Sequence, residues 1–112
     1  MHAFAATWGA DGVLYLEGEL DLAAEAAAVG ALRSRPPGAN DLVIDLSRLT
    51  FMDSTGIRVL ETVVMGPPAT RVVLRGPRRG VRKVLELVGI VNWPTVAVGA
   101  EAAASREDSF IF

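Results

Sequence analysis

The residues of this sequence best suited to chemistry lie together in one stretch, Asp53-Ser54-Thr55-Gly56. This stretch follows a short apolar run, 42–46, and precedes apolar residues at helical spacing. A hydroxyl and a carboxylate are therefore expected where a strand gives way to a helix, and ligands and partners commonly meet α/β folds at such junctions. Ser54 is either a functional hydroxyl or, like Asp53, a simple helix cap, and the local sequence leaves both interpretations open.

Other catalytic and metal chemistry has little support in the sequence. The chain has no cysteine, which excludes disulfides, zinc–thiolate sites and thiol catalysis. Its single histidine, His2, lies near the N-terminus and is poorly placed for a Ser-His-Asp triad. Neither a P-loop nor a G-x-G-x-x-G pattern occurs, so we expect no nucleotide to be bound by this chain alone.

Asp45 is a second carboxylate to consider, because it interrupts the apolar run 42–46. It is either an exposed carboxylate at the end of a strand or a phosphoacceptor of the receiver type. A receiver also needs an acidic pair after its first strand to hold Mg²⁺. The stretch Ala6-Thr7-Trp8-Gly9 provides no such pair, so the sequence argues against receiver chemistry.

Charge and hydrophobicity indicate a small soluble domain. The formal net charge of −2 gives no electrostatic footprint for nucleic acid or an anionic membrane. Hydrophobic residues make up 51% of the 112 residues, enough for the core of a single domain, 1–112. No signal peptide and no apolar run of membrane-spanning length is present, so we expect a cytoplasmic protein without membrane insertion. The basic cluster Arg78, Arg79, Arg82 and Lys83 is interpreted as a solvated helix face.

The rest of the chain is expected to position the junction on a sheet. Apolar runs between turn residues predict five strands, over Ala3–Trp8, Val13–Glu17, Leu42–Leu46, Arg71–Arg75 and Pro94–Val98. Helical spacing predicts four helices, over Leu22–Arg33, from near Ser54 to Gly66, over Val81–Val88 and over Ala100–Asp108. Asp21 is expected to cap the first helix and Gly89 to end the third.

Several apolar residues are expected to face the core. On the first three helices these are Leu22, Ala26, Val29 and Leu32, then Ile57, Leu60, Val63 and Val64, then Val81, Val84, Leu85 and Val88. Phe110-Ile111-Phe112 is expected to pack back on the core, because it would otherwise be an unusual exposed apolar patch.

The order of elements predicts the fold class. A hairpin opens the chain, and from Leu42 onward strands alternate with helices, which favours parallel pairing through right-handed crossovers. We therefore expect an α/β fold with a mixed central β-sheet, in which an N-terminal hairpin is followed by alternating helices and strands.

Three ordered segments resemble the STAS domain, and specifically the bacterial anti-sigma factor antagonist family. They are GELD at 18–21, LVIDLSRLTFMDSTGIRVL at 42–60 and RGPRRGVRKVLELVGI at 75–90. The stretch from Phe51 to Gly56, FMDSTG, is the most specific of them. The resemblance covers nearly the whole chain and shifts the interpretation of Ser54 from a cap toward a functional hydroxyl.

The resemblance implies a phosphorylation switch. Unphosphorylated antagonists of this family bind an anti-sigma factor that is also a serine kinase, which then releases its sigma factor. The kinase supplies ATP and Mg²⁺ and phosphorylates the antagonist, which dissociates until a phosphatase restores it. By this resemblance Ser54 is the phosphoacceptor; Asp53, Thr55 and Gly56 shape its loop, and Asp21 and Arg58 line the partner surface. The chain itself would be neither an enzyme nor a cofactor-binding protein.

Two other functions remain open. The same fold serves as a constitutive STAS subunit of larger assemblies, such as a lipid ABC transporter, where Ser54 need not be modified. A sensor of a small ligand or nucleotide is the third possibility, and no sequence motif calls for it.

Overall fold

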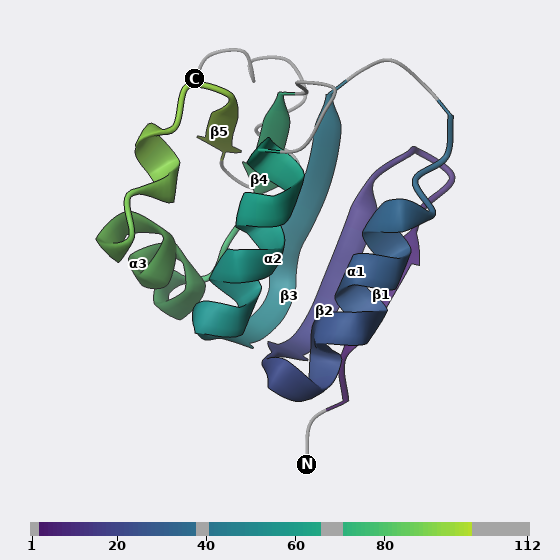
Figure 1. Ribbon diagram of the computed structural model, residues 1–112, viewed down its shortest axis with the longest axis horizontal. Coiled ribbons are helices and arrows are strands. Elements are labelled where there is room, and N and C mark those ends of the chain that lie inside the picture. Colours follow the sequence, from purple (N-terminus) through teal and green to yellow (C-terminus); the bar gives the residue numbers. More distant parts are fainter. Residues whose placement is uncertain (1–2, 38–40, 66–70, 100–112) are drawn as a thin grey trace.

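The computed structural model describes residues 3–37, 41–65 and 71–99, and its central feature is a five-stranded sheet (Figure 1). The strands lie side by side in sequence order and are β1 (Ala5–Trp8), β2 (Leu14–Leu20), β3 (Leu42–Met52), β4 (Val72–Arg75) and β5 (Val96–Gly99). The helices are α1 (Glu25–Arg33), α2 (Ser54–Met65) and α3 (Arg79–Leu87), with short 3-10 turns at Leu22–Ala24 and Ile90–Asn92.

The sheet is mixed, as the sequence predicts. β1 pairs with β2 in an antiparallel hairpin, whereas β2, β3, β4 and β5 are parallel to one another. The three helices each connect neighbouring parallel strands, and right-handed crossovers taken in one direction place them on one face. Figure 1 shows α1 and α2 lying across the front of the sheet, with α3 beside α2. The predicted fold class is confirmed.

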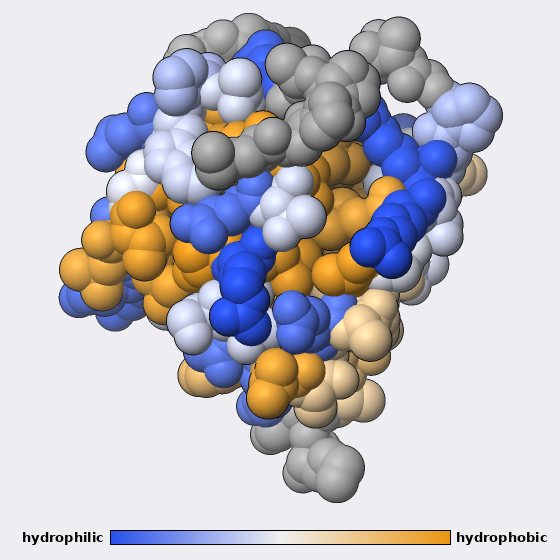
Figure 2. Space-filling view, viewed as in Figure 1, coloured by the Kyte–Doolittle hydropathy of each residue, from blue (hydrophilic) through white to orange (hydrophobic). Residues whose placement is uncertain are grey.

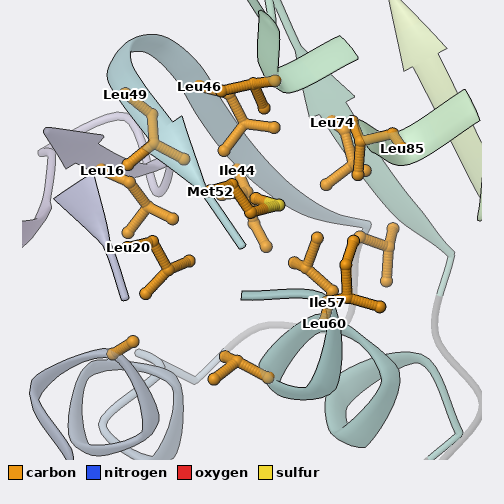
Figure 3. Close-up of a cluster of buried hydrophobic side chains, with 14 of the residues drawn as sticks. Leu16, Leu20, Ile44, Leu46, Leu49, Met52, Ile57, Leu60, Leu74 and Leu85 are labelled. Atoms are coloured by element: carbon orange, nitrogen blue, oxygen red, sulfur yellow. The ribbon is translucent and has the colours of Figure 1, made fainter. Parts of the chain in front are cut away.

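The helices and the sheet enclose one apolar core (Figure 3). Its labelled side chains come from β2, β3, β4, α2 and α3, and they are Leu16, Leu20, Ile44, Leu46, Leu49, Met52, Ile57, Leu60, Leu74 and Leu85. Ile57 and Leu60 are buried on α2 as predicted, and Val63 and Val64 pack partly against the core. Val59, which the predicted face omitted, is buried as well.

β3 is longer than predicted. The sequence suggested a strand over Leu42–Leu46 followed by a connection, but β3 continues to Met52. Its pairing with β2 shifts register twice along the strand, and such irregularities interrupt the two-residue alternation on which strand prediction depends. Pairing with β4 ends at Asp45, so the last part of β3 carries the chain beyond β4 with only β2 beside it.

The predicted apolar face of the first helix is right for Val29 and Leu32, which pack partly against the core, and wrong for Leu22 and Ala26. Ala24 and Ala28 are buried, whereas Leu22 is 68% exposed and Ala26 is also exposed. The segment begins as a 3-10 turn, capped by Asp21, whose carboxylate accepts a hydrogen bond from the Ala24 amide at 3.3 Å. A 3-10 turn has three residues per turn, so it rotates the following α-helix relative to a helix that is regular from Leu22.

The third helix buries Val81 and Leu85 as predicted but ends earlier than the predicted face. Gly89 has a φ of 79° and turns the chain in the left-handed region, as expected for a glycine after a helix. Val88 is therefore 48% exposed instead of buried. The predicted helix over 100–108 and the tail 110–112 lie outside the described residues.

Asp45 is neither exposed nor at the end of a strand. It is 5% exposed in the middle of β3, where its Oδ2 accepts a hydrogen bond from Arg75 Nε at 2.9 Å and its Oδ1 accepts one from the Ser47 hydroxyl at 2.6 Å. Arg75 also donates to the Tyr15 hydroxyl at 3.3 Å, and Tyr15 donates to Asp11 at 2.6 Å. This polar network joins β2, β3, β4 and the hairpin turn, so Asp45 has a structural role in connecting the strands of the sheet.

The Asp45–Arg75 pair makes folding pH-dependent. Burial raises the pKa of Asp45, but hydrogen bonds from Ser47 and Arg75 outweigh it and hold that pKa below its ordinary value. A lowered pKa in the folded state gives stability that is present above the unfolded pKa of about 4 and is lost as the pH falls through the folded pKa. Asp45→Asn should therefore destabilise the protein by about 2 kcal/mol at pH 7. The difference in unfolding free energy from wild type should shrink between about pH 5 and pH 2. Urea denaturation across this range measures it, and a difference independent of pH would contradict the role of Asp45.

Gly18 permits the irregular pairing of β2. Its φ is 94°, and a Cβ at this position would collide with the backbone carbonyl of Ala3. Gly12 in the hairpin turn has a similar φ of 82° but open space around it. Gly18→Ala should thus lower the free energy of unfolding by about 3 kcal/mol or more, and Gly12→Ala by about 1 kcal/mol. Urea denaturation compares the two, and equal losses would contradict the close approach of Ala3.

Candidate functional site

The candidate site is the junction at which β3 ends and α2 begins. Asp53 caps α2, because its Oδ1 accepts a hydrogen bond from the Thr55 amide at 2.8 Å and its carbonyl accepts one from the Ile57 amide at 3.2 Å. Within the described part of the chain, the Ser54 hydroxyl makes no hydrogen bond. Asp53, and not Ser54, therefore caps α2. The Ser54 hydroxyl is left without a hydrogen bond among the described residues.

Only one of the two neighbouring hydroxyls is accessible. Ser54 is exposed, whereas Thr55 is 6% exposed. Gly56 is buried, and a Cβ there would collide with the Met52 side chain and lie 3.1 Å from Leu20 Cδ2. Glycine thus lets the first turn of α2 pack against the ends of β2 and β3, and this packing holds Ser54 at the surface.

Asp21 lies at the same edge of the sheet as the junction. Leu20 pairs with Met52, and the Asp53 amide donates to the Leu20 carbonyl at 3.5 Å, so Asp21 and Asp53 directly follow paired strand ends. The edge around Ser54 is therefore acidic. Both carboxylates already accept hydrogen bonds from backbone amides, which fixes their positions.

Arg58 lies on the exposed side of α2, one turn after Ser54. Its Nη2 is 3.7 Å from Oε2 of Glu25 on α1. The structure thus brings Asp21, Asp53 and Ser54 together at one edge, while the guanidinium of Arg58 connects α2 to α1.

Sequence reasoning missed the apolar part of this edge. Leu22, assigned to the core, is exposed, and Phe51 is 45% exposed near the end of β3. An open pocket of about 580 Å³ includes Asp21 in its lining, together with Ala3, Phe4, Glu19, Ala23, Ala24 and Ala27. The position of Phe51 follows from the β2–β3 register, which no local pattern in the sequence specifies.

A second exposed apolar area lies away from the junction. Figure 2 shows a mixture of hydrophilic and apolar side chains over α1 and α2, and apolar surface over α3. Leu87 is 77% exposed there, next to Val88. The basic residues Arg79, Arg82 and Lys83 are exposed as predicted, and Arg78 donates to the Ser47 carbonyl at 2.9 Å.

The described residues do not form a metal site or a membrane span. In the ranges 3–37, 41–65 and 71–99, no three histidine, cysteine, aspartate or glutamate residues lie close enough to hold a metal ion. In the same ranges, no helix combines the length and the apolar character needed to cross a bilayer.

Comparison with known proteins agrees with this architecture. A solved structure described as the anti-sigma factor antagonist SpoIIAA in its unphosphorylated form is similar to the chain, with a TM-score of 0.54 and 27% sequence identity. The similarity covers 98% of this chain and 100% of SpoIIAA. Among curated proteins no match was found. A family model described as "Mlab, STAS domain" matches residues 4–96. The chain therefore belongs to the STAS domain family.

Proposed function

We propose that this protein is an anti-sigma factor antagonist whose binding to its partner is switched off by phosphorylation of Ser54. The observation that carries the proposal is the state of the junction, where Asp53 caps α2 and leaves the exposed Ser54 hydroxyl unoccupied. Support also comes from the similarity to SpoIIAA, which covers 98% of this chain and 100% of SpoIIAA. Unphosphorylated, the protein would bind an anti-sigma factor with serine kinase activity and release the sigma factor. A phosphatase would reverse the modification.

The chain contributes a positioned hydroxyl and no catalytic group. The Asp53 carboxylate is engaged with the Thr55 amide, so its role is to fix the first turn of α2. Phosphoryl transfer needs ATP, Mg²⁺ and a base, which the kinase would supply. This division of roles suits a protein that acts as a kinase substrate and not as an enzyme.

Phosphorylation acts through local charge. A phosphoserine adds about −1.5 to −2 charges and three acceptor oxygens at neutral pH. The N-terminus of α2 tolerates negative charge because the helix dipole is positive there. A tight interface does not tolerate this charge, because Asp21 and Asp53 already make this edge acidic and burying a charge that is not fully compensated costs several kcal/mol. Since about 1.4 kcal/mol corresponds to a tenfold change in affinity, one phosphate is sufficient to release a partner without refolding the domain.

A second candidate function is a constitutive STAS subunit of a larger assembly, such as a lipid ABC transporter. The observation that favours it is the description of the matching family model, which names Mlab and not a sigma regulator. Co-purification distinguishes the two candidates. Recovery of a transporter ATPase in place of a serine kinase supports the second.

Incubation with the anti-sigma factor kinase and ATP should attach one phosphate to the wild type and none to Ser54→Ala. Thr62→Ala is the matched control, because Thr62 is an exposed hydroxyl on the same helix whose Oγ1 bonds to the Arg58 carbonyl. It should be phosphorylated like the wild type. Intact mass spectrometry measures the product, and equal phosphorylation of wild type and Ser54→Ala would overturn the assignment of Ser54.

A further inference from the structure

Arg58 is placed to respond to a charge on Ser54. The two residues are four positions apart on α2, and side chains at this spacing lie on the same side of a helix within reach of each other. The Arg58 side chain is 57% exposed, which leaves it free to reorient. Among the cationic side chains of the structure's described residues, Arg58 is the one on the first turns of α2.

The present partner of Arg58 holds it only weakly. Its Nη2 lies 3.7 Å from Oε2 of Glu25, whose side chain is 36% exposed. Exposed ion pairs of this kind contribute little to stability, because water screens them and both side chains lose freedom. A doubly charged phosphate with three acceptor oxygens is a stronger partner for a guanidinium than a single exposed carboxylate.

We propose that Arg58 is a positioning residue for the phosphorylated state, which leaves Glu25 and pairs with the phosphate on Ser54. The inference rests on the proposed function only in taking Ser54 as the residue that becomes phosphorylated. Asp53, the nearest charged neighbour of Ser54 in the sequence, does not stabilise the phosphate, because its carboxylate caps α2 and carries a negative charge itself. The phosphate would then pair with the guanidinium of Arg58, one helical turn further along α2.

The movement of Arg58 from Glu25 to the phosphate would change the charge of a wider surface than the phosphate covers. When Arg58 turns to the phosphate, Glu25 on α1 loses the cation described beside it. The edge then presents the carboxylates of Glu25, Asp21 and Asp53 around the phosphate. Phosphorylation of one residue on α2 would thus make the neighbouring surface of α1 more acidic and break an ion pair between two helices.

The test uses the 112-residue chain with phosphoserine incorporated genetically at position 54, so that no kinase is required. Titration followed by ³¹P NMR measures the second pKa of the phosphate. Because a nearby cation favours the dianion, Arg58→Gln should raise this pKa by about 0.3, the size expected for an exposed pair at this spacing. Arg58→Lys should restore most of the difference. Glu25→Gln should lower the pKa, because it releases Arg58 and removes a negative charge.

Arg71→Gln is the matched control. Arg71 forms an exposed pair with Asp41 at the same distance, 3.7 Å, but precedes β4, beside the start of β3. Its replacement removes the same charge and should leave the phosphate pKa unchanged. Equal pKa values in wild type, Arg58→Gln and Arg71→Gln would overturn the role of Arg58 and leave the phosphorylation of Ser54 standing. Failure of the kinase to phosphorylate Ser54 would overturn the proposed function and leave the measured pKa difference standing.

Discussion

The site depends on the packing of the end of β3 against the end of β2. Beyond Asp45, β3 runs without β4 beside it, and its register with β2 brings Leu20 next to Met52. The first turn of α2 then packs on these two side chains, which requires a glycine at position 56. This contact fixes the first turn of α2, which carries the hydrogen bond between Asp53 and the Thr55 amide and the exposed Ser54. Apolar packing thus determines where the hydroxyl lies, although no apolar side chain takes part in its chemistry.

The sequence was sufficient to predict the fold class and the junction, because both follow from local patterns. Strands alternating with helices indicated the parallel sheet, and Asp53 followed by apolar residues at helical spacing indicated the start of α2. The left-handed Gly89 after α3 was predicted on the same basis. Each of these features is specified within a few residues.

What the sequence did not predict depends on contacts between distant segments. The true end of β3 follows from its register with β2, and the burial of Asp45 follows from Arg75 on β4. The exposure of Leu22 is the exception, because it follows from a local 3-10 turn that changes the rotation of α1. Leu22 and the end of β3 lie near the start of α2, so the surface around Ser54 was harder to predict than the junction itself.

In the proposed function, this domain is a binding module that presents the exposed Ser54 hydroxyl at the start of α2, and its partner would supply the catalysis. The central claim of the proposal is that a phosphate on Ser54 weakens the complex through charge. The most direct measurement is the affinity of the anti-sigma factor kinase for the unphosphorylated protein and for protein carrying phosphoserine at position 54, by calorimetry. We predict that the phosphate weakens binding at least tenfold, or about 1.4 kcal/mol. Equal affinities for the two forms would contradict the account.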